Sequence, residues 1–395
     1  MTFSWAVAPS AAGETVLKTG TQIYLIRLIW LFRAPSHSHL LRAAAGGNKV
    51  EGVLLIEPFD CGATASPGER AAIHDLIVQP AAPWFSEVER RHLEGALSGE
   101  FGAVARDRFW IARIGAEPVA NVYFCTAAGA PEIGLLAFAI TAPAYRGRGI
   151  GRLLLREALA DFVAAGGACM HLATGNSTAQ RVYESGGFRD YQGHIMRFLA
   201  PGGGWEGFDR AYFEDCGPGQ IRRGHWGDSA RAALLYVAPH PWFVRDYAER
   251  LYNHPAIAQT RCASVLPALM LNTTERPAGA NLATGGLWVL ENPARRLVGA
   301  ATVTPPDLSA QAHAPIIDFL VAPAYMGQAP DLLTVALDAS RSGGAECVRC
   351  CVAACDRGKI DVLLQVGFRR EAMLAGQLKA GYERFDLHIY TYPWV

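Results

Sequence analysis

Two short sequence words that recur at one spacing constrain the fold of this chain more than any other feature. Pro143-Ala144-Tyr145 returns as Pro323-Ala324-Tyr325, and Gly187-Phe188-Arg189 returns as Gly367-Phe368-Arg369. Both recurrences lie 180 positions apart, since 323 minus 143 equals 367 minus 187. A fixed internal period is typical of a duplicated structural unit, with chance recurrence of short words as the alternative. We therefore predict two copies of one domain.

Length and composition agree with a duplication and exclude some partners. The 395 residues have room for two or three domains of about 150 residues each. Lys+Arg and Asp+Glu both total 36, so no overall field would draw the protein to nucleic acid or to an anionic membrane. The nine cysteines form no small disulfide framework and indicate reduced thiols in a cytoplasm.

Residues 23–32 form an apolar stretch interrupted by Arg27. The stretch is too short for a bilayer, which takes about 20 apolar residues, so we expect no membrane span. It also lies too far from Met1, without a small-residue cleavage pattern, for a convincing signal peptide. We interpret residues 1–52 as an extension of unknown role, whose apolar stretch packs on the next domain as a helix or strand. A membrane-surface or partner-docking segment is the alternative.

Hydrophobic periodicity predicts an α+β or mixed α/β layout after this extension. We expect strands at 53–57, 109–114, 119–125, 133–140, 168–173 and 195–199, and helices at 69–78, 87–97, 152–165 and 177–185. Breaker residues at 201–204 and 216–219 then indicate a domain boundary. The predicted division is a first domain at 53–200, a linker at 201–219 and a second domain at 220–395.

The run from Arg146 to Gly151 lies between an expected strand and an expected helix. Its three glycines allow the backbone to curl with its N–H groups pointing inward, and the helix adds the positive end of its dipole. A pyrophosphate would fit there. The alternative is an ordinary strand-to-helix turn with its arginines in solvent.

The second copy lacks this loop. At the offset of 180, the equivalents of Arg146, Arg148, Gly149, Ile150 and Gly151 are Met326, Gln328, Ala329, Pro330 and Asp331. Pro330 has no N–H, and Asp331 places a negative charge where a phosphate needs a donor. Tyr183 likewise becomes Leu363, and Asn176 becomes Asp356. Tyr183 could simply pack on the sheet, but its loss together with the loop favours a functional role.

Residues 141–151, Asn176 to Ala179, and Tyr183 with Gly187 resemble the signature of the GNAT acyl-CoA-dependent N-acetyltransferases. The loop matches that family's Arg/Gln-x-x-Gly-x-Gly/Ala pattern, and 176, 179 and 183 match its Asn-x-x-Ala-x-x-x-Tyr pattern. The resemblance covers about residues 53–200, and 220–395 resembles a degenerate tandem copy. It implies, in each copy, a twisted, mostly antiparallel central sheet with a splayed parallel strand pair, flanked by helices.

The resemblance also implies acetyl-CoA as the acyl donor. Its pyrophosphate would bind Arg146, Gly147, Arg148, Gly149, Ile150 and Gly151, and its pantetheine arm would follow Phe138, Ala139, Ile140 and Thr141. Asn176 would orient the arm, and Tyr183 would give a proton to the departing thiolate. Because a phenol has a pKa of about 10 and a thiol about 8.5, Tyr183 must act by hydrogen bonding in the transition state or have its pKa lowered.

Glu132, at the start of the central strand, lies near the position where many family members carry a general base. A solvated strand-end glutamate is the alternative interpretation. His171, Tyr123 or a chain of water molecules could also take the proton of the acceptor.

We expect a small-molecule amine as the acceptor, attacking acetyl-CoA directly without a covalent enzyme intermediate, and no nucleic-acid partner; a homodimer is left open. Other acyl-CoA chemistry on the same fold, and a non-enzymatic acetyl-CoA-binding module, are the alternatives. No metal is expected at Cys347, Cys350, Cys351 and Cys355, because adjacent cysteines on a strand point to opposite faces.

Overall fold

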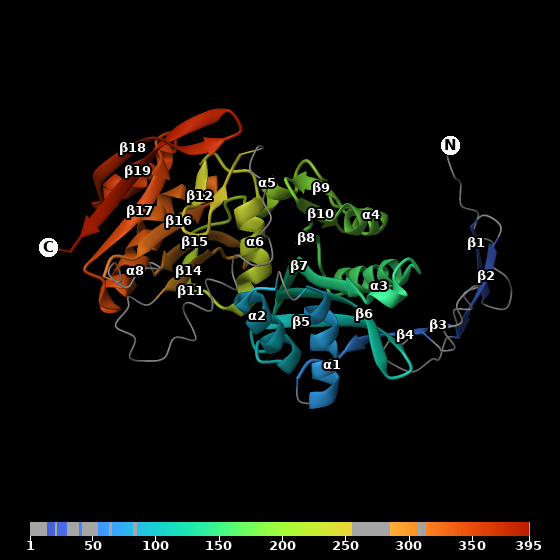
Figure 1. The fold of residues 1–395 in the computed structure, drawn as a ribbon. Coiled ribbons are helices and arrows are strands. Elements are labelled where there is room, and N and C mark those ends of the chain that lie inside the picture. Colours follow the sequence, from blue (N-terminus) through green and yellow to red (C-terminus); the bar gives the residue numbers. More distant parts are fainter. Residues whose placement is uncertain are drawn as a thin grey trace.

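The computed structural model describes residues 14–19, 22–29, 39–41, 54–62, 65–81, 85–254, 285–305, 311 and 313–394. The first half of the chain forms one sheet with four helices (Figure 1). Its elements are β4 (Leu54–Phe59), α1 (Pro67–Val78), α2 (Glu87–Ser98), β5 (Ala105–Ile114), β6 (Glu117–Ala127), β7 (Ala130–Thr141), α3 (Ile150–Ala164), β8 (Cys169–Ala173), α4 (Ser177–Ser185), β9 (Arg189–Gln192) and β10 (Ile195–Leu199). Three strands, β1 (Glu14–Thr19), β2 (Gln22–Ile29) and β3 (His39–Leu41), continue this sheet beyond β4.

The second half builds another sheet. Its elements are α5 (Phe208–Tyr212), β11 (Gln220–Arg223), the 3-10 turn η3 (Trp226–Asp228), α6 (Ser229–Val237), β12 (Val244–Asp246), β13 (Leu251–Tyr252), β14 (Gly286–Glu291), β15 (Leu297–Thr304), β16 (Ile316–Val321), η5 (Pro323–Gln328), α8 (Ala329–Ser342), β17 (Cys347–Ala353), α9 (Arg357–Val366), β18 (Arg369–Ala380) and β19 (Glu383–Pro393).

The two halves share one strand order. From β4 the first sheet runs β4-β5-β6-β7-β8-β10-β9, and the second runs β11-β14-β15-β16-β17-β19-β18. Each contains one parallel pair, β7 with β8 and β16 with β17, among antiparallel neighbours. The predicted α+β architecture, with a parallel strand pair inside a mostly antiparallel sheet, is therefore confirmed.

Local signals explain where α1 and α2 begin. Ser66 and Ser86 each accept a hydrogen bond from the backbone N–H three residues later, at Glu69 and Glu89. Both glutamates return a bond to the backbone of the serine, which completes a capping box. Such caps satisfy N–H groups that the first helical turn leaves unpaired.

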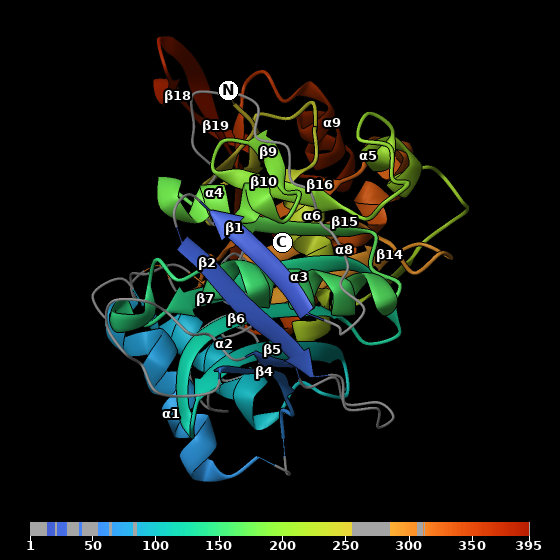
Figure 2. The ribbon, with the colours of Figure 1, turned by 90° about the vertical axis from the view of Figure 1, so that its right-hand side faces the viewer.

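The central strands of the first sheet are buried on both faces. On β6, Tyr123 and Cys125 belong to one apolar core, whereas Val122 and Phe124 belong to another, as expected from the two-residue period of a strand. Helix α3 contacts β5, β6 and β7, and α6 from the second half contacts β6, β7 and β8. Figure 2 shows β1 and β2 nearest the viewer, α3 and α4 behind them, and the second half at the back.

Helix α6 joins the two halves. All nine of its residues are buried, and it contacts β15 as well as the first sheet. At the preceding turn, Trp226 stacks on Phe101 with ring centroids 4.3 Å apart. Gly227 approaches the carbonyl of Val104 so closely that a Cβ would overlap it. One continuous apolar core therefore crosses between the halves.

The predicted linker at 201–219 contains helix α5, which the sequence pattern did not indicate. Asp209 on this helix accepts hydrogen bonds from Arg197 and from the Tyr191 hydroxyl, and Tyr212 is buried. The residues of the first sheet that bind Asp209 lie 12 and 18 positions away along the chain, so local periodicity could not indicate these contacts.

Most of residues 23–32 belong to β2, which agrees with the strand alternative for that stretch. Among the described helices, none combines the length and the apolar character needed to cross a bilayer.

Candidate active site

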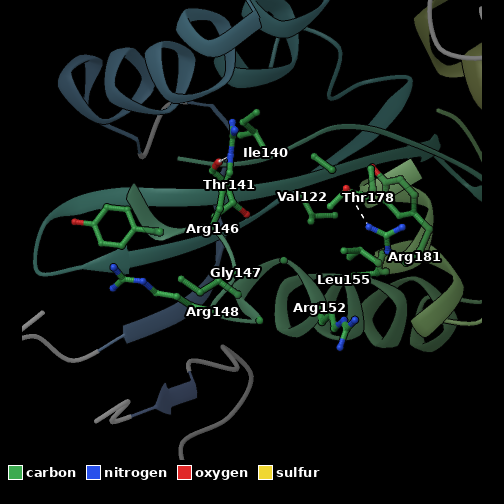
Figure 3. A pocket seen from close by; sticks show the side chains of 18 of the residues that line it. Val122, Ile140, Thr141, Arg146, Gly147, Arg148, Arg152, Leu155, Thr178 and Arg181 are labelled. Carbon is green, nitrogen blue, oxygen red and sulfur yellow. Dashed lines mark hydrogen bonds between the residues drawn. The ribbon is translucent and has the colours of Figure 1, made fainter. Parts of the chain in front are cut away.

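A cavity of about 650 Å³ opens where β6, β7, the glycine loop, α3 and α4 meet. Figure 3 shows the side chains of this cavity. The structure brings eleven of the thirteen predicted site residues to its wall: Ala139, Ile140, Thr141, Arg146, Gly147, Arg148, Gly149, Ile150, Gly151, Asn176 and Tyr183. Phe138 and Glu132 are not among the residues that line it.

The glycine loop has the backbone shape expected of an anion cradle. Gly147 and Gly149 have φ angles of +74° and +78°, a left-handed conformation that favours glycine. Gly149 is the N-cap of the 15-residue helix α3, so the positive end of that helix dipole faces the cavity. Arg146 Nε donates to the carbonyl of Thr141 at 2.9 Å, which ties the loop to the end of β7.

The charge of the wall is positive. Arg146, Arg148, Arg152 and Arg181 line the cavity, and the described residues of the wall include no aspartate or glutamate. Figure 3 shows Arg148 beside the loop and Arg152 on α3, with Arg181 hydrogen-bonded to Thr178 at 3.2 Å. Four arginines along a wall that also contains a helix N-terminus suit a ligand with several phosphates.

Strand β7 carries a bulge beside the cavity. Asn121 pairs with Ile140 and Tyr123 with Ala137, so Phe138 and Ala139 both lie opposite Val122. Phe138 has a φ of +49°, which is strained for a residue other than glycine. Its ring packs against His92, Tyr123 and Phe85, away from the cavity. Only the backbone of Phe138 is therefore placed to serve the cleft.

The parallel strand pair opens next to this bulge. Strand β7 pairs with β8 from Ile133 to Leu135, although β7 continues to Thr141. The last residues of β7 are thus separated from β8, and the cavity lies in that opening. The predicted splayed pair is confirmed in the first sheet.

Tyr183 lies on α4 with its ring packed edge-on against Phe188, at 5.9 Å between centroids. Burial raises the pKa of its phenol to about 12. Of the two alternatives drawn from the sequence, a lowered pKa is therefore wrong. The phenol keeps its proton at neutral pH and can act only as a hydrogen-bond donor or as an acid late in the reaction.

Asn176 is the N-cap of α4. Its Oδ1 accepts the backbone N–H groups of Thr178 at 2.9 Å and Ala179 at 3.3 Å. The cap engages this oxygen, so the Nδ2 group is the part of the side chain left to orient a ligand.

Glu132 lies at the opposite end of β7 from Thr141 and faces the second half of the chain. Its carboxylate pairs with Arg296 at 3.0 Å. Arg296 also donates to the carbonyl of Ala211, so the pair belongs to the contact between the halves. The structure does not bring Glu132 to the cavity, because the strand length separates them.

The alternative bases Tyr123 and His171 are both buried. The Tyr123 hydroxyl donates to Asp107 at 2.6 Å and lies 3.2 Å from His92 Nε2. Burial raises the pKa of Asp107 to about 6 and lowers that of His92 to about 4.

His171 accepts a hydrogen bond from Arg197 Nε at 2.9 Å, and burial together with this guanidinium lowers its pKa. Neither His171 nor Tyr123 lines the cavity.

In the second half, the positions 180 residues later are engaged by contacts within the chain. Asp318, at the position of Phe138, pairs with Lys359, and Lys359 also donates to the carbonyl of Val244. Asp356, at the position of Asn176, accepts the backbone N–H groups of Phe243 and Val244. Backbone groups of Phe243 and Val244, at the start of β12, thus use the hydrogen-bonding groups of Asp356 and Lys359.

Residues 105–190 match the family model described as an acetyltransferase (GNAT) domain. This segment contains the bulge, the glycine loop and Tyr183. Over these residues the match agrees with the GNAT resemblance of the two sequence motifs. A search of curated proteins finds no significant match to the chain.

Several solved acetyltransferases resemble the chain. A GNAT superfamily phosphinothricin acetyltransferase from Sinorhizobium meliloti, in complex with acetyl-CoA, is 10% identical with a TM-score of 0.37, over 45% of this chain and 89% of that one. The ribosomal-protein-alanine N-acetyltransferase from Brucella melitensis is 16% identical with a TM-score of 0.35, over 44% and 99%. An N-acetyltransferase from Staphylococcus aureus Mu50 is 13% identical with a TM-score of 0.36, over 45% and 99%.

The polar residues of this cavity that the sequence reasoning missed include Asn121, Arg152 and Arg181. A usable signal existed for two of them. At the offset of 180, Arg152 becomes Leu332 and Arg181 becomes Asp361, the same loss of cation that affects the loop. Asn121 lies on a strand outside both motifs, and its place became visible only in the tertiary structure.

Proposed function

We propose that this protein transfers the acetyl group of acetyl-CoA to the amine of a small molecule by direct attack, in the cavity of its first half. The observation that carries the proposal is the joint presence, in one cavity, of an anion cradle, four arginines and the Tyr183 phenol. The same positions in the second copy have lost all three features.

The residues of the cavity suit both the pyrophosphate of acetyl-CoA and the arm that carries its thioester. The backbone from Arg146 to Gly151 and the start of α3 would hold the pyrophosphate, with the arginines neutralising its charge. The arm would follow Ala139, Ile140 and Thr141, where β7 has left β8. The thioester would then lie near the bulge, where a backbone N–H could stabilise the oxyanion.

The proposed reaction needs one bond to form and one to break. The amine nitrogen attacks the thioester carbon, and the carbon–sulfur bond breaks. The Tyr183 phenol donates a hydrogen bond to the departing thiolate, and the proton lost by the nitrogen ends on the sulfur, which leaves as the CoA thiol. Because the pKa of Tyr183 is raised to about 12, the phenol stays protonated and stabilises the negative charge on sulfur by hydrogen bonding. Glu132 is left out because it pairs with Arg296 outside the cavity.

Isothermal titration of acetyl-CoA into wild type and Gly149→Asp tests the cradle. Aspartate at the α3 N-cap adds a negative charge beside the pyrophosphate, so we expect binding at least about 100-fold weaker. Gly115→Asp is the matched control, because Gly115 also has a positive φ of +61° and open space, but lies in the turn between β5 and β6. Undiminished binding by Gly149→Asp would refute the assignment.

Release of CoA with a panel of small amines tests the reaction itself. Turnover with at least one amine supports the proposal. Binding of acetyl-CoA without turnover for any amine would favour a non-enzymatic binding module instead.

A further inference from the structure

Asn121 on β6 is fully buried and lines the cavity at the bulge of β7. Its Nδ2 donates to the backbone carbonyl of Phe138 at 2.8 Å. This bond holds the residue whose φ of +49° creates the bulge. A strained backbone persists only where neighbouring contacts impose it, and Asn121 supplies such a contact.

The other side-chain atom of Asn121 has no protein partner. Its Oδ1 is buried and accepts no hydrogen bond in the structure. A buried amide oxygen that accepts no hydrogen bond is unfavourable. A donor from outside the protein chain would therefore stabilise Asn121 in this position. Because Asn121 lines the cavity, that donor would come from a ligand bound there.

The second copy offers an internal comparison. At the offset of 180, Asn121 becomes Ala301 and Phe138 becomes Asp318. The ladder between β15 and β16 is continuous through Ala301, Thr302 and Val303, without the register shift seen at Asn121. The amide and the bulge are therefore absent together in the copy that has also lost the glycine loop.

We propose that Asn121 is a positioning residue of the acyl site. Its Nδ2 locks the bulge of β7 so that a backbone N–H faces the thioester carbonyl, and its Oδ1 accepts an amide N–H from the arm of the bound acyl donor. The inference rests on the proposed function, because it takes an acyl-CoA as the ligand of the cavity. It adds a residue that lies outside both sequence motifs.

NMR of acetyl-CoA labelled with ¹³C at the thioester carbon tests whether Nδ2 of Asn121 locks the bulge. A backbone hydrogen bond to this carbonyl moves its resonance downfield of that of free acetyl-CoA. We expect this shift with wild type and its loss with Asn121→Ala and Asn121→Asp. The aspartate variant keeps the shape of the side chain but lacks the N–H donor to Phe138. Circular dichroism and thermal unfolding identify a variant that does not fold.

Titration with CoA, which has the arm but no acyl group, tests whether Oδ1 of Asn121 accepts a hydrogen bond from the arm. Loss of one neutral hydrogen bond predicts about fivefold weaker CoA binding by Asn121→Ala. Acetyl-CoA would lose the contact to its arm and also the contact to its thioester carbonyl. Its binding by Asn121→Ala should therefore weaken by a further factor of about five. Thr126→Val is the matched control, since Thr126 is a buried polar residue of β6 that does not line the cavity.

The outcomes separate the two proposals. If wild type binds no acetyl-CoA, the proposed function fails and the inference fails with it. If wild type binds and both folded Asn121 variants keep the carbonyl shift, the locking role is overturned while the function stands. If Asn121→Ala binds CoA as tightly as wild type, the role of Oδ1 is overturned.

Discussion

At the scale of single residues, burial sets what each titratable group can do. The Tyr183 phenol and the Tyr123–Asp107 pair are both shielded from water, yet only Tyr183 reaches the cavity. Desolvation disfavours the charged form, which raises the pKa of Tyr183 and of Asp107 and lowers that of His92. The chemistry assigned to a residue therefore follows from its surroundings as much as from its type.

Tyr183→Phe is expected to lower the rate of CoA release by roughly 100-fold or more, with acetyl-CoA affinity retained. The phenol is active while protonated, and its protonated form is lost only as the pH rises through about 12. Tyr183 should therefore cause no loss of rate between pH 7 and 10. Steady-state assays across this range, with titration of acetyl-CoA, check both statements.

Glu132→Gln serves as the comparison for the Tyr183 variant. Because Glu132 pairs with Arg296 at a partly exposed contact, the neutral variant should turn over at the wild-type rate. Collapse of turnover in Glu132→Gln would reinstate this residue as the general base, and an unchanged rate in Tyr183→Phe would remove the phenol from the mechanism.

At the scale of elements, one helix terminus combines a structural and a binding task. Asn176 caps α4 through Oδ1 and borders the cavity. The sequence spacing of 176, 179 and 183 indicated both the helix and its cavity-facing side, because these positions are one helical turn apart. The bulge of β7 was not predictable in this way, since it depends on an asparagine of the neighbouring strand.

Two substitutions at Asn176 should separate these tasks. Asn176→Ala removes the cap and should lower the free energy of unfolding by about 1 kcal/mol. Asn176→Asp keeps an oxygen for the two N–H groups, so stability should be preserved while acetyl-CoA binding weakens through the added negative charge. Urea unfolding and calorimetric titration measure the two effects, and equal losses of stability in both variants would contradict the separation.

At the scale of the whole molecule, the two halves share one core. Helix α6 lies between the sheets, and Trp226 stacks on Phe101 of the first half. The second half thus covers one face of the first sheet. We propose that supporting the first sheet is a role of the second half.

Gly227→Ala tests that support. A Cβ at Gly227 would overlap the backbone oxygen of Val104, which cannot move away as a flexible side chain would. We expect a loss of about 2 kcal/mol or more in stability, with separate unfolding transitions for the halves. Gly207→Ala is the control, because a Cβ at Gly207 meets no atom within 4 Å. Differential scanning calorimetry distinguishes one transition from two.

The sequence by itself determined the repeat of two short words at an offset of 180, the glycine loop, the helix that Asn176 caps and that carries Tyr183, and the replacement of these residues at that offset. These features depend on neighbours close along the chain, because turns, caps and helical spacing are local. Only the tertiary structure decided that Glu132 pairs with Arg296, that Asn121 holds the bulge, and that four arginines meet at one cavity. Those relations join residues distant in sequence, and their energies come from burial and contact that exist only once the sheets have packed.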